Sequence, residues 1–240
     1  MNGAFSVRRV SDAFSDLMRE GARSGRVPLR PLALQESQLG PDVVAMEVIT
    51  ADGIITCLRH GDPDEVTTVF VGGALGGLSG PAGGLYHRVA SALGGVRLHY
   101  RKPGHMEDCL MDVLLIQHIL HRRGIERLVL VGHSFGGAVA IGAGALLADA
   151  CAGVVALSTQ VPGTELVDRL AGTPILLIHG ENDGVLPDLC SRNVYARAGE
   201  PKQLILLPGE GHVLEGAAQR LGDELTRFIT ECGAGAAGTA

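Results

Sequence analysis

An apolar run that ends in a glycine-flanked serine is the feature that most constrains this chain of 240 residues. Residues 128–131 are Leu-Val-Leu-Val, which is typical of a strand buried on both faces of a parallel sheet. Gly-His-Ser-Phe-Gly follows directly at residues 132–136, and the small residues 137–141 predict the start of a helix. The strand–turn–helix context predicts a nucleophile elbow, in which a strained turn lifts the hydroxyl of Ser134 above the sheet edge.

Two further apolar segments end in polar, glycine-containing loops, and these loops carry an acid and a histidine. Residues 174–179 predict a strand, and Asp183 lies on the loop that follows it. Residues 203–207 predict another strand, and the glycine-rich turn after it carries His212. The chain order serine, aspartate, histidine differs from the orders in chymotrypsin and subtilisin, and it is the order that follows a G-x-S-x-G elbow.

The three motifs together resemble those of the α/β-hydrolase superfamily, and the similarity runs from about Val43 to Ile229. The motifs are Gly-His-Ser-Phe-Gly at the elbow, His-Gly-Glu-Asn-Asp around the acid and Gly-Glu-Gly-His at the histidine. Within the superfamily, the chain is most similar to small, lidless serine esterases related to dienelactone hydrolase. The resemblance implies an α/β fold whose central sheet is mostly parallel, with about eight strands and helices on both faces. The short segment 158–166 leaves no room for a lid domain.

This resemblance assigns a chemical role to each residue. Ser134 would be the nucleophile, and His212 would take its proton and later return it to the leaving group. Asp183 would fix the tautomer of the imidazole. The backbone N–H groups of Phe135 and of Ala74 would form the oxyanion hole. Alignment of Gly72-Gly73 with the family's His-Gly places the second donor on Ala74, and Leu75 is the alternative.

The function expected from these residues is that of a serine hydrolase that cleaves an ester or thioester of a small acyl group through an acyl-enzyme. One alternative is an acyltransferase or cofactor-free haloperoxidase built on the same triad. Another is a non-catalytic protein that uses the fold as a binding module. Glu181 and Asp188 compete with Asp183 for the role of the acid, and we favour Asp183 because it occupies the motif position.

The pattern of apolar and turn residues predicts one folded domain at 41–232. Residues 1–40 are predicted to be a lead-in with a short helix at Ser11–Glu20, and the Gly/Ala-rich end at 233–240 is predicted to be disordered. A hairpin is expected at Val43–Thr50 and Ile54–His60. Further strands are predicted near 67–72, 96–100, 127–132, 153–158, 174–179 and 203–207. Helices are predicted near 83–94, 107–123, 135–148, 163–170, 187–198 and 214–231.

Composition excludes several other classes of protein. The formal net charge is −6 and no long basic run occurs, so nucleic acid is not an expected partner. No apolar run is long enough to cross a membrane. The five cysteines show no Cys-x-x-Cys pair, and no signal peptide is evident, which favours reduced thiols in the cytoplasm. The expected partner is a small-molecule substrate, and a homodimer is left open.

Three features that suggest other sites have simpler explanations. The glycine-rich segment 72–80 lacks the Gly-Lys-Ser/Thr ending of a phosphate-binding loop, so no nucleotide cofactor is expected. His118 and His121 share one face of a predicted helix, but a polar helix face explains them without a metal. Cys190 follows Asp183 closely and is interpreted as a small helix residue.

Overall fold

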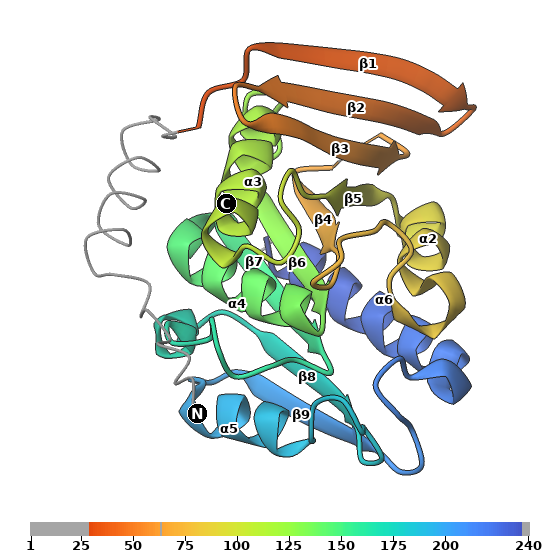
Figure 1. The fold of residues 1–240 in the computed structure, drawn as a ribbon, viewed down its shortest axis with the longest axis vertical. Coiled ribbons are helices and arrows are strands. Elements are labelled where there is room, and N and C mark those ends of the chain that lie inside the picture. The colour runs from red at the N-terminus through yellow and green to blue at the C-terminus, as the bar shows by residue number, and fades with distance from the viewer. Residues whose placement is uncertain (1–28, 63, 237–240) are drawn as a thin grey trace, which may run out of the picture.

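The computed structural model describes residues 29–62 and 64–236, which contain one sheet of nine strands in the order β1-β2-β3-β5-β4-β6-β7-β8-β9 (Figure 1). The strands are β1 (Ala33–Gly40), β2 (Val43–Thr50), β3 (Gly53–His60), β4 (Val66–Val71), β5 (Gly95–His99), β6 (Arg127–His133), β7 (Cys151–Leu157), β8 (Ile175–Gly180) and β9 (Lys202–Leu207). The strands from β4 to β9 are parallel to their neighbours, whereas β1, β2 and β3 form an antiparallel extension that meets β5.

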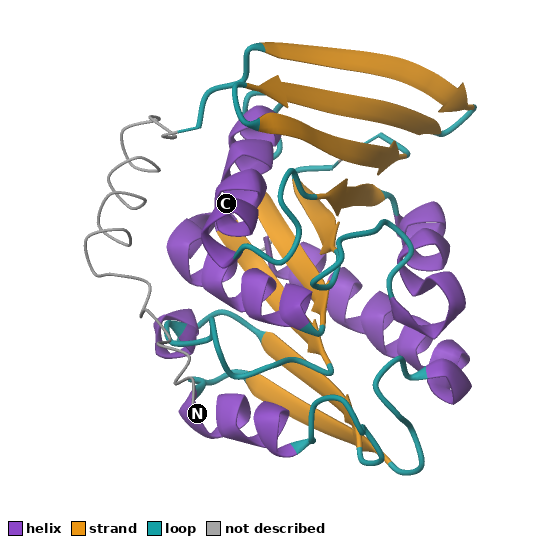
Figure 2. Cartoon of the chain, in the orientation of Figure 1, coloured by secondary structure: helices purple, strands orange, loops and turns teal. Residues whose placement is uncertain are grey.

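Helices cover both faces of this sheet, as Figure 2 shows. They are α2 (Pro81–Leu93), α3 (Met106–His121), α4 (Phe135–Leu147), α5 (Leu189–Arg197) and α6 (Ala218–Ala236). Apolar side chains of α2 and α6 pack on one face, and those of α3, α4 and α5 pack on the other. The predicted architecture, a mostly parallel sheet between two layers of helices, is confirmed.

The parallel strands place their carboxyl ends at one edge of the sheet, and the loops that carry the motif residues leave the sheet there. In the register of β4 against β6, Val71 lies opposite Gly132, so the glycine-rich segment 72–80 and the elbow begin side by side. The central strands are buried almost throughout. This burial on both faces explains why their sequences are continuously apolar rather than alternating.

The ninth strand, β1, was not predicted. Its residues, Ala33–Gly40, fall in the segment 1–40 that the sequence analysis treats as a lead-in, so the domain begins before residue 41. Almost every residue of β1 is exposed, which leaves the sequence without an apolar pattern. The strand is held by antiparallel backbone pairing with β2, and Leu34 lies opposite Val48.

Two other boundaries differ from the prediction. The helix predicted at 163–170 is wrong: only a short 3₁₀ turn, Val167–Leu170, is present. Gly163 adopts a φ of 90° there, which ends any regular helix at its start. Helix α6 continues to Ala236, so residues 233–236 of the end predicted to be disordered are helical, although Gly233 and Gly235 favour helix poorly. The helix predicted at Ser11–Glu20 and residues 237–240 lie outside the described residues.

The segment between β7 and the 3₁₀ turn contains no helical insertion. It runs from Ser158 to Leu166 as a loop with two short turns. Over these described residues, the carboxyl edge of the sheet therefore has no lid at this position, as the sequence predicted.

Candidate active site

Ser134 lies at the sharp turn between β6 and α4. Its φ of 58° and ψ of −123° lie in a region that residues with a side chain rarely adopt. Such a conformation costs on the order of 1–3 kcal/mol and persists only where the surroundings hold it. The Ser134 N–H donates a hydrogen bond to the carbonyl of Leu157 on the neighbouring strand β7, at 2.8 Å. The predicted elbow geometry is therefore present.

Two glycines make this turn sterically possible. A Cβ atom added to Gly132 would lie 1.9 Å from the carbonyl oxygen of Gly136. A Cβ added to Gly136 would lie 2.3 Å from the carbonyl oxygen of Gly72. The pattern Gly-x-Ser-x-Gly thus reflects two close backbone approaches, and the second one seats the glycine-rich segment 72–80 directly against the elbow.

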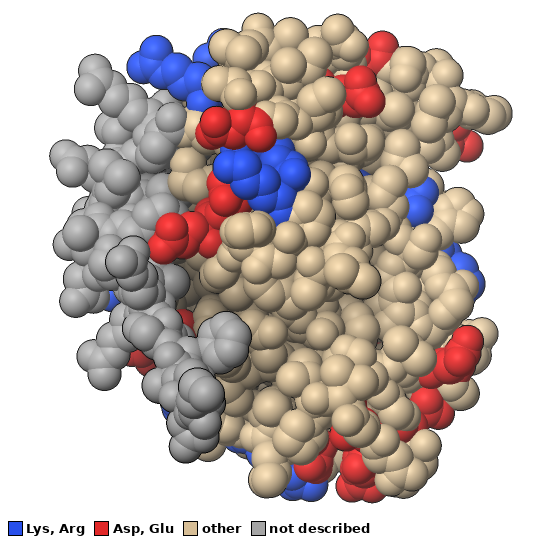
Figure 3. All heavy atoms as spheres, in the orientation of Figure 1, with Lys and Arg blue, Asp and Glu red and all other residues tan. Residues whose placement is uncertain are grey.

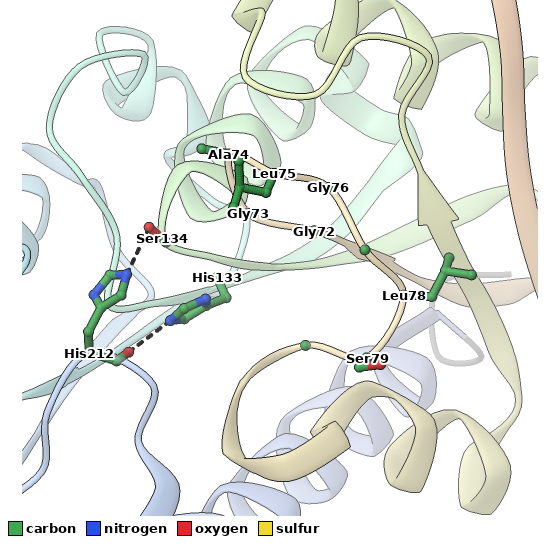
Figure 4. A pocket seen from close by; sticks show the side chains of 12 residues that line it. Gly72, Gly73, Ala74, Leu75, Gly76, Leu78, Ser79, His133, Ser134 and His212 are labelled. Carbon is green, nitrogen blue, oxygen red and sulfur yellow. Dashed lines mark hydrogen bonds between the residues drawn. The ribbon is translucent and has the colours of Figure 1, made fainter.

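The structure brings Ser134, His212 and Asp183 into one hydrogen-bonded chain. The Nε2 atom of His212 lies 3.0 Å from the Oγ atom of Ser134 (Figure 4). The Nδ1 atom of the same ring lies 2.7 Å from Oδ2 of Asp183. Of the two competing carboxylates, Glu181 is exposed, and Asp188 forms an ion pair with Arg192 at 2.8 Å. The acid in contact with the histidine is therefore the one at the motif position.

Asp183 is buried and its carboxylate is fully hydrogen-bonded. Its Oδ1 atom accepts the backbone N–H groups of Val185 and Leu186, each at 2.8 Å. Burial alone would raise the pKa of Asp183, but the hydrogen bonds from Leu186, His212 and Val185 outweigh it and hold the pKa below its usual value. The group is therefore an anion at neutral pH, oriented with Oδ2 toward His212.

Two histidines that the sequence analysis did not single out support these residues. His179, fully buried at the end of β8, has Nε2 3.2 Å from Oδ2 of Asp183 and 3.0 Å from the carbonyl of Leu186. His133 donates from Nε2 to the backbone carbonyl of His212 at 2.8 Å, and the two rings are 4.8 Å apart between centroids. Burial lowers the pKa of His133 to about 4. Both residues belong to motifs that the sequence analysis quotes, His179-Gly180 and Gly-His-Ser. Membership in these motifs is the feature of the sequence that could have identified them.

A cavity of about 390 Å³ opens beside Ser134 and extends along the glycine-rich segment (Figure 4). Its wall consists of residues 72–80 together with His133, Ser134 and His212. The N–H of Gly76 donates to the carbonyl of Gly73 at 2.9 Å and closes a tight turn, with Ala74 and Leu75 at its tip. Leu75 is 93% exposed at the lip of the cavity. The two residues considered for the second oxyanion donor thus line the cavity that holds the serine.

The metal and cysteine sites considered in the sequence contribute nothing to this cavity. Among residues 29–62 and 64–236, no cluster of three or more His, Cys, Asp or Glu residues could hold a metal ion. His121 faces Glu126 at 3.5 Å, and Cys190 lies half-buried on α5 and does not line the cavity. In the same part of the chain, no helix is long and apolar enough to cross a membrane.

Comparisons with known proteins find similarity to hydrolases over part of the chain. A family model described as phospholipase/carboxylesterase matches residues 109–218. The uncharacterized protein YfhR of Escherichia coli O157:H7 is 33% identical over 142 residues, which cover 48% of this chain and 50% of that protein. The chain therefore spans about half the length of the curated relatives that it matches.

Two solved structures share the fold. An acetyl xylan esterase from Paenibacillus sp. R4 has a TM-score of 0.70 at 14% identity, with 96% of each chain covered. XC6422 from Xanthomonas campestris, described as an α/β serine hydrolase without lid, has a TM-score of 0.66 at 17% identity, over 81% of this chain and 97% of that one. These solved structures show that the chain has the α/β-hydrolase fold, and the family match over residues 109–218 is a similarity to phospholipases and carboxylesterases.

Proposed function

We propose that the protein cleaves an ester or thioester of a small acyl group through an acyl-enzyme formed on Ser134. The observation that carries the proposal is the continuous hydrogen-bonded chain from Ser134 Oγ through His212 to Asp183, beside an open cavity. A serine hydroxyl is a weak nucleophile at neutral pH and needs an adjacent base. The distance of 3.0 Å between Oγ and Nε2 lies within reach of direct proton transfer.

The arrangement of hydrogen bonds assigns the proton positions. Asp183 accepts the N–H at Nδ1 of His212, so Nε2 is unprotonated and accepts the hydroxyl proton of Ser134. As Oγ attacks the carbonyl carbon, the proton moves to Nε2, and Asp183 stabilises the imidazolium that forms. The proton then passes to the departing alcohol or thiol as its bond to the acyl carbon breaks. Water repeats the two proton transfers and releases the acid.

The oxyanion of the tetrahedral intermediate needs two N–H donors. Phe135 is the first residue of α4, so its N–H has no acceptor within the helix and lies beside the nucleophile. Ala74 lies at the tip of the turn that closes between Gly73 and Gly76, and Leu75 is the next residue along. We assign the donors to Phe135 and Ala74, with Leu75 as the alternative. Each donor of this kind is worth about 3 kcal/mol in the transition state.

A small acyl group fits the shape of the site better than a long one. Five of the twelve residues that line the cavity are glycines, which have no side chain to enclose an alkyl chain. An acyl methylene gains about 0.8 kcal/mol only where the protein buries it. The similarity to an acetyl xylan esterase supports the same choice.

Hydrolysis of p-nitrophenyl butyrate by the wild type and by Ser134→Ala tests the proposal. We expect the substitution to lower turnover by about 10⁶-fold, because it removes the atom that attacks. An added alcohol that is acylated in preference to water would instead support the acyltransferase. Absence of turnover on every ester and thioester, with an intact fold, would favour the non-catalytic binding protein.

A further inference from the structure

The loops at the mouth of the candidate site, which follow the carboxyl ends of β4, β7, β8 and β9, carry acidic side chains but no Lys or Arg. These loops are residues 72–80, 158–166, 181–188 and 208–214, and their charged residues are Glu165, Glu181, Asp183, Asp188 and Glu210. The loop after β5 carries Arg101 and Lys102, which form ion pairs with Asp112 and Asp108. In Figure 3, a group of Lys and Arg side chains lies above the middle of the view with acidic side chains beside it, and the middle itself is uncharged.

The cavity itself offers no cation to a substrate at neutral pH. Its lining holds no Lys or Arg, and the two ionisable side chains in it are His133 and His212. Burial lowers the pKa of His133 to about 4, so this ring is neutral at pH 7. Arg97 contacts the cavity wall from behind, through a hydrogen bond from Nη1 to the carbonyl of Leu78 at 3.1 Å. Arg97 is buried and is not a lining residue.

Exposed apolar side chains also surround the mouth. Leu75 is 93% exposed, Val185 is 69% exposed beside the acid, and Val213 is 50% exposed beside the histidine. An anionic group brought here would lose hydration without gaining a charged partner. It would also approach the carboxylate of Asp183, which is an anion at neutral pH.

From these observations, and resting on the proposed function, we infer that the site selects neutral esters and thioesters and discriminates against substrates that bring anionic groups to its mouth. Coenzyme A thioesters and half-esters of dicarboxylic acids belong to the disfavoured class. Simple alkyl, aryl and sugar esters belong to the favoured one.

Matched substrate pairs test this selection. One pair is p-nitrophenyl hexanoate and the mono-p-nitrophenyl ester of adipic acid, which differ by a terminal carboxylate. The other is S-butyryl-N-acetylcysteamine and butyryl-coenzyme A. We expect kcat/KM to be at least about tenfold lower for the anionic member of each pair, since its anionic group loses hydration without gaining a cationic partner. Equal or higher kcat/KM for the anionic members would overturn the inference. Failure to cleave any member would instead contradict the proposed function.

A charged variant links the selectivity to the mouth. Leu75→Lys places a cation at an exposed position of the lip, and we expect it to reduce the preference for the neutral ester by at least about threefold. Leu32→Lys is the matched control, because Leu32 is 70% exposed and lies next to the edge strand β1, away from the cavity lining. An unchanged ratio in Leu75→Lys, or an equal change in both variants, would show that the lip does not set the selectivity.

An independent observation concerns the acid. Asp183 is contacted by two histidines, and each of these contacts a serine: His212 bonds Ser134, and His179 Nδ1 lies 2.7 Å from Oγ of Ser191. The carbonyl of Leu186 can only accept, so Nε2 of His179 carries the proton and Nδ1 accepts the hydroxyl proton of Ser191. Ser191 therefore fixes the tautomer that donates to Asp183.

The geometry points to His179 and Ser191 as positioning residues that act through Asp183. His179 shares Oδ2 with His212, so it fixes the direction of that oxygen and withdraws part of its charge. Loss of this donor would leave Asp183 holding the protonated form of His212 more tightly. The base would then remain protonated to higher pH.

Ser191→Ala removes one buried oxygen, and it tests this role more gently than a change at His179. We expect kcat to fall by about tenfold with KM unchanged, and the acid limb of the pH–rate profile to move up by about half a unit. Ser191→Cys, which keeps a weak donor, should recover part of both effects. Ser91→Ala is the control, because Ser91, which lies on α2, also contacts two histidines, His60 and His87. An unshifted acid limb in Ser191→Ala would overturn the assignment and leave a packing role only.

Discussion

Replacement of Asp183 by asparagine isolates the role of the acid, because the structure dictates how the amide must sit. The Oδ1 atom accepts two backbone N–H groups, from Val185 and Leu186. The amide oxygen of an asparagine must take this place, since an NH₂ group would face two donors. Its NH₂ group then replaces Oδ2, where it faces His212 and the N–H of His179.

This orientation reverses the proton positions on His212. The NH₂ group of the asparagine can only donate, so Nδ1 of His212 becomes the acceptor and Nε2 becomes protonated. A protonated Nε2 cannot take the hydroxyl proton of Ser134. We therefore expect kcat of Asp183→Asn to fall by roughly 10⁴-fold, equivalent to about 5 kcal/mol of transition-state stabilisation.

Steady-state hydrolysis of p-nitrophenyl butyrate measures this loss, with circular dichroism to verify the fold. Glu181→Gln is the matched control, since Glu181 is an exposed carboxylate on the same loop, and it should retain most of the activity. If Asp183→Asn kept more than about a tenth of the wild-type kcat, the tautomer argument would be refuted. If Glu181→Gln showed the larger loss, the role of the acid would pass to Glu181.

Three further predictions test other parts of the account. Across p-nitrophenyl esters, activity should be highest up to about butyrate, because the open cavity buries few methylenes. A protein that is a monomer by light scattering and prefers decanoate would contradict this prediction, whereas in a dimer the second subunit could cover the cavity. Burial lowers the pKa of both His60 and His133 from 6.5 to about 4, so their contribution to stability is complete above pH 6.5 and is lost as pH falls through 4. Urea denaturation at pH 7, 5.5 and 4 should therefore show a falling free energy of unfolding, and a flat profile would argue against this linkage. Gly132→Ala should destabilise the fold by about 3 kcal/mol and abolish activity, because its Cβ would overlap the Gly136 carbonyl, whereas Gly222→Ala on α6 meets no atom within 4 Å and should not destabilise.

The sequence predicts the parts of this fold that depend on local pattern. Strands β4 to β9 lie within two residues of their predicted positions, because their burial on both faces makes each one a short apolar run. The edge strand β1 has no such pattern, since its side chains are exposed and backbone pairing alone holds it. The helix predicted at 163–170 fails because a glycine with positive φ interrupts a segment that is otherwise suitable.

The candidate site divides in the same way. Ser134, Asp183 and His212 each follow a recognisable strand, so the motifs indicate them and the structure brings them together. The contact of His179 with the acid depends on how the loop after β8 folds back, and no spacing in the sequence encodes that. The lack of Lys and Arg at the mouth is present in the sequence as four separate loops, but only the parallel sheet shows that they meet at one edge.

Covalent labelling by a fluorophosphonate tests the central claim, that Ser134 is a nucleophile activated by His212 and Asp183. Intact-mass and peptide mass spectrometry of the labelled wild-type protein should show one adduct, located on Ser134. Labelling should be absent in Ser134→Ala and far slower in Asp183→Asn. A folded wild-type protein that remains unlabelled, or an adduct that persists in Ser134→Ala, would contradict the account.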